Sequence, residues 1–205
     1  ALTTRRQRDL GVALVNMGSA TTTLTVFEEG DVLTMKVFPV GSRHITSDIA
    51  IGLRTSIDVA EEIKLTYGTC MPGKVERREE FDLAELSASE HGRIVRREVA
   101  EIISARVEEI LGLISDELER INRVGKLPAG VILSGGGVKL PEFVELTKQT
   151  LRLPVVIGVP VKVTSPIDHA TDPAYATVVG LLAWAARTAS PNTSQFSIMG
   201  EAPSG

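Results

Sequence analysis

The chain lacks the features that mark several large classes of protein. Cys70 is the only cysteine among 205 residues, so no internal disulfide can form and we expect a reducing, cytoplasmic location. No apolar run approaches the roughly 18 residues that a membrane-spanning helix needs. The net charge of −4 offers no basic surface for nucleic acid. These absences predict a cytoplasmic protein that does not bind nucleic acid.

Side chains for covalent or metal chemistry are also few. The histidines His44, His91 and His169 have no metal-ligand spacing, and no second cysteine could complete a zinc site. The sequence places no histidine beside Cys70, so a buried, unreactive thiol is its expected state. We predict no catalytic residue and no protein-bound metal centre.

Two glycine-rich turns, each after a short apolar run, are the main feature that is present. The run 12–17 leads into the turn 18–22, and the run 131–134 leads into three consecutive glycines, 135–137. Glycine lets a backbone lie close to a ligand, and the amides and hydroxyls of such a turn can bind phosphate oxygens. Together the two turns predict two strand ends that meet at one nucleotide.

The first turn matches neither of two well-known phosphate-binding motifs. No Gly-Lys-Ser/Thr follows it, as a P-loop requires, and the next segment is a strand rather than the helix of a dinucleotide fold. Asn16 stands at the end of the first strand, where a carboxylate would hold hydrated magnesium. Because an amide oxygen carries no charge, we expect weaker magnesium binding.

Glu61 and Lys64 form a second candidate group. They are one helical turn apart and therefore lie on the same helix face. Such a pair could bind a ribose hydroxyl and lie beside a base. An exposed ion pair with no ligand is the alternative interpretation.

Hydrophobic periodicity predicts an α/β protein with a mixed sheet flanked by helices. The first strand is almost wholly apolar, as a strand covered on both faces would be. The expected strands are 12–17, 22–28, 31–38, 131–134 and 153–160; the expected helices begin near residues 42, 55, 94, 140 and 172, and the third reaches residue 124. In the last helix we expect Trp184 in the core and an apolar face packed on the sheet, made of Tyr175, Val178, Val179, Leu182 and Ala186.

In chain order, these segments resemble the bacterial actin-like cell-division family FtsA, from about residue 10 to 187. The first turn resembles the family's second phosphate motif, usually Asp-Ile-Gly-Gly-Gly-Thr-Thr. The other matching segments are Pro39-Val-Gly-Ser-Arg-His-Ile-Thr-Ser-Asp-Ile-Ala, Ala60-Glu-Glu-Ile-Lys, Ala100-Glu-Ile-Ile-Ser-Ala-Arg-Val-Glu-Glu, Leu127-Pro-Ala-Gly-Val-Ile-Leu-Ser-Gly-Gly-Gly and Asp172-Pro-Ala-Tyr-Ala-Thr-Val-Val-Gly.

The resemblance implies an actin-like (ribonuclease H-like) ATPase lobe with a smaller inserted α/β subdomain. Lobe IIA would comprise residues 1–41 and 104–190, lobe IIB residues 42–103, and a flexible tail residues 191–205. The chain would be the second half of the molecule, because the other phosphate loop and the group that orients the attacking water belong to the family's first half.

The resemblance also implies a cofactor, ATP with Mg²⁺ in the full-length protein. We expect the isolated fragment to bind ATP weakly or not at all and to be inactive, and the full-length protein to be at most a weak ATPase. Asn16, Ser19 and Ala20 depart from the family motif by one lost charge and two added side chains. The expected cofactor-binding residues are Asn16, Gly18, Ser19, Thr21, Thr22, Glu61, Lys64, Gly135, Gly136 and Gly137.

The partner implied by the resemblance is the C-terminal peptide of the tubulin-like division protein FtsZ, bound to lobe IIB. Arg106 and Glu109 match family positions tied to that contact, and Arg96 lies earlier on the same helix. Pairing of Arg106 with neighbouring glutamates alone is the alternative. The resemblance further implies self-association into filaments and a peripheral position at the inner face of the cell membrane at the division site, through a C-terminal helix absent from this chain.

Other classes remain as alternatives at this point. One is half of an actin-superfamily phosphotransferase, of the sugar or acetate kinase type, which would need a carboxylate where Asn16 stands. A pilus-assembly actin-like ATPase shares the fold, although the segment 39–68 favours the division family. A chaperone nucleotide lobe would continue into a peptide-binding domain, which does not follow residue 187. Fold alone does not decide among them.

Overall fold

The computed structural model describes residues 2–159 and 171–188, and a five-stranded mixed sheet forms its centre. The strand order is β3-β2-β1-β6-β7. β1 runs antiparallel to β2 and parallel to β6, which confirms the predicted mixed sheet. The strands are β1 (Val12–Met17), β2 (Thr22–Glu28), β3 (Asp31–Phe38), β6 (Val131–Ser134) and β7 (Val155–Ile157).

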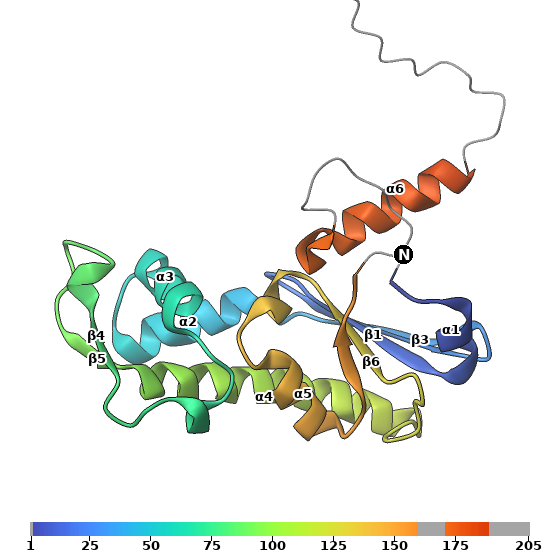
Figure 1. Cartoon of the computed structure of the whole chain (residues 1–205), viewed down its shortest axis with the longest axis horizontal. Helices are drawn as coiled ribbons and strands as arrows, with labels where there is room; N and C mark the ends of the chain where they lie inside the picture. Colours follow the sequence, from blue (N-terminus) through green and yellow to red (C-terminus); the bar gives the residue numbers. More distant parts are fainter. Residues whose placement is uncertain (1, 160–170, 189–205) are drawn as a thin grey trace, which may run out of the picture.

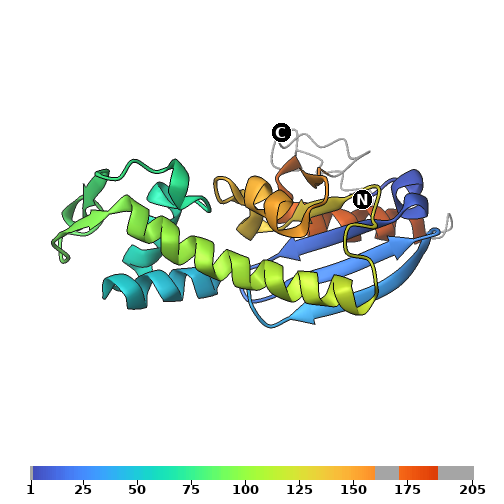
Figure 2. The same ribbon diagram turned by 90° about the horizontal axis from the view of Figure 1, so that it is seen from below.

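Helices cover both faces of this sheet (Figure 2). α4 (Arg96–Arg120) and α5 (Phe143–Leu151) lie on one face, and α6 (Ala176–Thr188) lies on the other. The core between the sheet and α4 contains apolar side chains from β1, β2 and β6, which is why these strands carry almost no charge. The short α1 (Arg5–Leu10) precedes β1 and contacts β2.

A smaller group of elements extends from one end of the sheet (Figure 1). It contains α2, α3 and a two-stranded β-sheet, and all of them pack beside the first half of α4. The rings of Tyr67 and Phe81 stack at 3.9 Å and join α3 to this small sheet. The elements are α2 (Ser42–Leu53), α3 (Ile57–Tyr67), β4 (Glu80–Asp82) and β5 (Arg93–Val95), with short 3-10 turns at Pro72–Lys74 and Leu83–Glu85.

α4 connects the two parts of the molecule without a break. Its 25 residues run beneath both the sheet and the smaller group, and residues 103 and 104 lie inside it. The helix was expected from residue 94, but Ile94 belongs to β5, where it pairs with Phe81. The predicted strand 153–160 is shorter than expected, and its residue 160 lies outside the described residues, as does the predicted tail 191–205.

The prediction for the last helix is wrong for most of its apolar face. Val179 is buried, but Val178, Leu182 and Trp184 are 54%, 66% and 64% exposed. Tyr175 and Ala186 are exposed as well. The reason is that small residues of this helix face the sheet, which leaves its large side chains outside; the small residues are Ala176, Thr177 and Gly180.

Among the described residues, no helix combines the length and apolar character that crossing a membrane requires.

Candidate functional site

The first glycine-rich turn connects β1 to β2 and is held from two sides. The amide of Gly18 donates to the carbonyl of Thr21 at 2.9 Å, which closes the turn. The first amides of α2, those of Ser42 and Arg43, donate to the carbonyls of Gly18 and Ser19, both at 2.9 Å. Gly41 permits this approach, because a Cβ there would lie 2.6 Å from both of these carbonyl oxygens. The turn is therefore rigidly positioned at the start of α2.

The second turn follows β6 and lies directly beside the end of β1. Parallel pairing of Asn16 with Ser134 brings the carboxyl ends of both strands to one edge of the sheet. Gly135 has a φ of +91°, and a Cβ at this position would lie against the carbonyl oxygen of Met17 and 2.5 Å from Oδ1 of Asn16. A Cβ at Gly137 would lie 2.7 Å from Cγ of Met17. The second turn therefore packs against the end of β1, immediately before the first turn, and this contact requires glycine.

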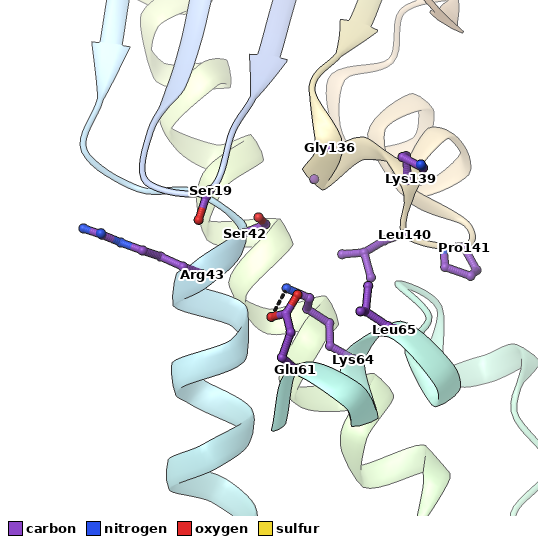
Figure 3. A pocket seen from close by; sticks show the side chains of 11 residues that line it. Ser19, Ser42, Arg43, Glu61, Lys64, Leu65, Gly136, Lys139, Leu140 and Pro141 are labelled. Atoms are coloured by element: carbon purple, nitrogen blue, oxygen red, sulfur yellow. Dashed lines mark hydrogen bonds and ion pairs between the residues drawn. The ribbon is translucent and has the colours of Figure 1, made fainter. Parts of the chain in front are cut away.

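A pocket of about 380 Å³ opens between these turns and α3 (Figure 3). Five of the predicted cofactor-binding residues line it, from both turns and from α3. In Figure 3 the side chains of Glu61 and Lys64 point into the space between Ser19 and Leu140. The predicted lining residues are Ser19, Glu61, Lys64, Gly136 and Gly137.

Glu61 and Lys64 form a hydrogen-bonded cluster with Thr46 rather than an exposed ion pair. Lys64 Nζ lies 2.6 Å from Glu61 Oε2 and 2.9 Å from Thr46 Oγ1, and Lys64 is only 6% exposed. The Thr46 hydroxyl donates to the same Glu61 oxygen at 2.5 Å. Burial acts to raise the pKa of Glu61, but the hydrogen bonds from Lys64 and Thr46 outweigh it and lower that pKa. The cluster therefore presents an ionised carboxylate to the pocket.

The structure places the other predicted residues around the pocket rather than in it. The hydroxyl of Thr22 is a correction to the prediction: it is buried and donates to the carbonyl of Val40 at 2.8 Å, so it cannot face a phosphate. Gly18 and Gly135 set the turn geometry without lining the pocket, and Thr21 is exposed on the turn. Asn16 lines a separate cavity on the α6 face, where its Nδ2 donates to Thr177 Oγ1 at 3.0 Å.

Sequence reasoning missed several lining residues. They come from the start of α2, from α3 and from the turn after the three glycines, and two of them are basic. Their signal in the sequence was proximity to the predicted motifs, because each lies within a few residues of one. The missed residues are Ser42, Arg43, Leu65, Lys139, Leu140 and Pro141.

The ligand set of the pocket does not suit a magnesium ion. Mg²⁺ requires hard oxygen ligands and is usually held by one or two carboxylates. Glu61 is the only carboxylate among the described lining residues, and it is occupied by Lys64 and Thr46. The described residues also contain no group of three histidine, cysteine, aspartate or glutamate side chains that could hold a metal. The chain thus provides no evident protein ligand for the magnesium that was expected with ATP.

Comparison with known families decides what kind of protein carries this pocket. Residues 13–180 match the protein family described as "Cell division protein FtsA". The chain belongs to the FtsA family. The matched range contains the central sheet, both glycine-rich turns and the whole of the smaller group of elements.

Curated FtsA proteins are similar along most of the chain. The cell division protein FtsA of Bacillus subtilis is 35% identical over 189 residues, which are 92% of this chain and 42% of that protein. The FtsA of Pseudomonas aeruginosa is 34% identical over 179 residues, 87% of this chain and 43% of that protein. The chain therefore spans less than half the length of these FtsA relatives.

Solved structures confirm the actin-like fold. MreB 5 of Spiroplasma citri bound to AMPPNP superposes with a TM-score of 0.69 at 18% identity, covering 88% of this chain and 54% of that one. The type IV pilus biogenesis complex PilM-PilN gives a TM-score of 0.61 at 20% identity, covering 88% of this chain and 47% of that one. At these identities the likeness concerns the fold alone.

The FtsA resemblance predicted three residues of α4 for partner binding. In the structure two of them are hydrogen-bonded to each other, and the third has other partners. Arg106 makes two hydrogen bonds to Asp48 of α2, at 2.6 and 2.9 Å, and one to Glu109 at 2.6 Å. Arg96 is the first residue of α4, where it donates to the carbonyl of Tyr67 and to Glu79. The hydrogen bonds and charge of Asp48 raise the pKa of Arg106. Arg106 and Glu109 are thus neighbours, whereas Arg96 has separate partners.

Cys70 is buried, as the sequence predicted. Burial, with a smaller effect from the charge of Glu142, raises the pKa of its thiol to about 12. The thiolate is therefore scarce at neutral pH, and Cys70 has no evident part in the site.

Proposed function

We propose that the chain is the nucleotide-binding half of an actin-like cell-division scaffold. The observation that carries this proposal is the pocket lined by both glycine-rich turns, with an ionised Glu61 beside a buried Lys64. Membership of the FtsA family supports the role in division. The nucleotide-bound state of the MreB 5 structure supports a nucleotide as ligand, since that protein shares the fold.

In this proposal the nucleotide spans the pocket from α3 to the first turn. Glu61 and Lys64 face the ribose and base, Gly136 and Gly137 lie against the adenosine, and the turn at Ser19 faces the phosphates. Residues 42–103 act as the inserted lobe IIB, and the elements around the central sheet act as lobe IIA. α4 belongs to both lobes, so it fixes α3 relative to the turns.

We expect weak ATP binding and no measurable hydrolysis by this chain alone. The relatives of this chain are more than twice its length, and we expect their other half to contribute to the site. Isothermal titration should give a Kd well above the micromolar range. Micromolar affinity would contradict the proposal that a second half completes the site, and no binding at millimolar ATP would contradict the pocket itself.

We further propose that lobe IIB binds the C-terminal peptide of FtsZ through the surface around Arg106 and Glu109. An acidic and apolar peptide would suit a positive side chain flanked by helix surface. Asp48 competes for that charge, since it already binds the Arg106 guanidinium at two atoms. Arg96 would contribute only if it released Glu79.

Peptide titration of two variants tests this partner site. Arg106→Gln is expected to weaken binding of the FtsZ C-terminal peptide about tenfold, because it removes a charge-assisted contact. Asp48→Asn should leave binding unchanged or strengthen it, because it releases Arg106 from its carboxylate partner. Thermal denaturation of both variants separates binding from folding. Equal peptide affinity of Arg106→Gln and the unmodified chain would remove the site.

The full-length protein would assemble into filaments and link the FtsZ ring to the membrane at the division site. Co-sedimentation of that protein with FtsZ polymers and lipid vesicles tests this role. Sedimentation of FtsZ with vesicles only when the protein is present would support it. Vesicle binding without recruitment of FtsZ would contradict it.

A further inference from the structure

The helix α6 lacks the charged outer side that a helix at a protein surface normally has. From Ala176 to Ala186 it contains no charged residue. Val178, Leu181 and Leu182 on its outer side are 54%, 60% and 66% exposed. Figure 1 shows α6 at the edge of the molecule, and no described element lies beyond it. A helix that is apolar on every side is normally buried inside a larger protein or spans a membrane.

The helix α4 provides a comparison within the same chain. It packs one side on the core, as α6 does, but its other side meets water with charged residues. Apart from Ala105, every exposed residue of α4 is charged, for example Glu101, Glu108 and Glu109. The apolar outer side of α6 is therefore a special feature of that helix and not a general property of the chain.

The inner side of α6 is only loosely packed. Among its described side chains, Ala176 and Val179 alone are buried. A cavity of about 310 Å³ separates Thr177 and Gly180 from the strands below them. With 13 residues, α6 is also shorter than the roughly 20 residues that cross a bilayer. The central sheet alone thus does not bury this helix, and burial against a further part of a larger protein would.

Exposed apolar side chains continue from α6 onto the same side of the sheet. Thr23 and Thr25 of β2 line the cavity below α6, so their side chains point to this side. They pair with Val37 and Met35 of β3, and paired residues of antiparallel strands point to the same face. Val37 is 56% exposed and Met35 is 66% exposed. Apolar surface from two separate elements on one side of a molecule is typical of an interface.

We propose that this surface, formed by the outer side of α6 with Met35 and Val37, is an internal interface that the other half of the full-length protein covers. The inference rests on the proposed function, in which the chain is one half of a division scaffold. The chain spans less than half the length of its FtsA relatives, so these contain enough further sequence for a second apolar surface.

The position of the chain's first residues supports the other half as the occupant. Leu2 and Thr3 line the cavity below α6, so a half that precedes this chain would join it beside that helix. A covalently linked half is present at high effective concentration, and it would occupy the surface in preference to a second copy. α6 would then pack between the sheet of this chain and the other half.

The test compares two introduced cysteines in the full-length protein, without lipid, by their rates of reaction with iodoacetamide. Leu182→Cys reports on α6, and Ile51→Cys on α2 is the control, because these side chains are 66% and 77% exposed in this chain. We expect Leu182→Cys to react about tenfold more slowly, since a covered thiol reacts only when the structure opens locally. Mass spectrometry of the labelled peptides measures each site separately from the buried Cys70.

The same variants of this chain alone, at high dilution, should react at similar rates, because the covering half is then missing. Equal rates in the full-length protein would overturn the inference, since α6 would then be open. Slow reaction of Leu182→Cys in the isolated chain would also overturn it, in favour of a second copy or of cover from within the chain. If Leu182→Cys does not fold, Val178→Cys on the same side of α6 replaces it.

ATP titration of the same full-length variants separates this inference from the proposed function. Equal labelling rates in a protein that binds ATP would overturn the interface alone. Slow labelling of Leu182→Cys in a protein that does not bind ATP would support the interface and overturn the nucleotide site.

Discussion

A Gly135→Ala variant is expected to lose about 3 kcal/mol of folding stability and most of its ATP binding. The loss has two sources. A residue with a side chain at a φ of +91° costs about 1 kcal/mol, and forcing a Cβ against a packed backbone costs roughly 1–3 kcal/mol more. The carbonyl of Met17 and the side chain of Asn16 occupy the space that the Cβ needs. The second turn would have to move away from the end of β1, which would distort the pocket.

The neighbouring glycine provides the matched control. An added Cβ at Gly136 would meet nothing closer than Ala174 Cβ at 3.9 Å, and its φ is not in the left-handed region. Gly136→Ala should therefore change stability by less than about 0.5 kcal/mol. Urea denaturation followed by circular dichroism measures both variants. Equal stabilities for the two would contradict the close contact between the second turn and the end of β1.

The second large effect is expected for Ile103→Ala, in the part of α4 beside α2 and α3. Ile103 is fully buried, and the truncation would leave a cavity in the core that joins the smaller group of elements to the helix. Removing a buried isoleucine side chain to Cβ costs roughly 3–4 kcal/mol. We expect the free energy of unfolding to fall by that amount. The urea midpoint should fall in proportion, while the slope of the free energy against urea concentration stays unchanged.

Ile51→Ala is the control for this prediction, because Ile51 lies on α2 and is 77% exposed. Its truncation should cost less than about 0.5 kcal/mol. A small effect of Ile103→Ala, similar to that of Ile51→Ala, would show that α4 does not hold the smaller group in place.

The sequence predicted the central sheet well because each strand carries its own local signal. β1 and β6 are buried, apolar runs, and β2 and β3 are joined by the polar turn at Glu29 and Gly30. The order of the strands and the parallel pairing of β1 with β6 were not predicted, because they depend on contacts between segments far apart in the sequence.

The last helix shows where periodicity alone was insufficient. Both faces of α6 contain apolar residues, so the pattern did not indicate which one meets the sheet. In the structure the side with Ala176, Thr177 and Gly180 faces the sheet across a cavity of about 310 Å³. The choice between the faces depends on the shape of the sheet surface, which the sequence of the helix does not encode.

The site was predicted in outline but not in the roles of single side chains. Glycine motifs and the spacing of Glu61 and Lys64 identified residues that the structure brings to one pocket. Thr22 was misassigned because alternation along β2 directs its hydroxyl into the core, toward Val40. Arg43 was missed because its place in the pocket lining depends on α2 beginning at the first turn, a contact between segments that no local pattern reveals.

The central claim is that both glycine-rich turns and α3 bind one nucleotide. Amide NMR of the isotope-labelled chain, titrated with ATP, tests it most directly. The account predicts that the amides of residues 18–21, 61–65 and 135–137 shift together along one saturation curve. Shifts confined to one turn, or curves with different midpoints for the two turns, would contradict it.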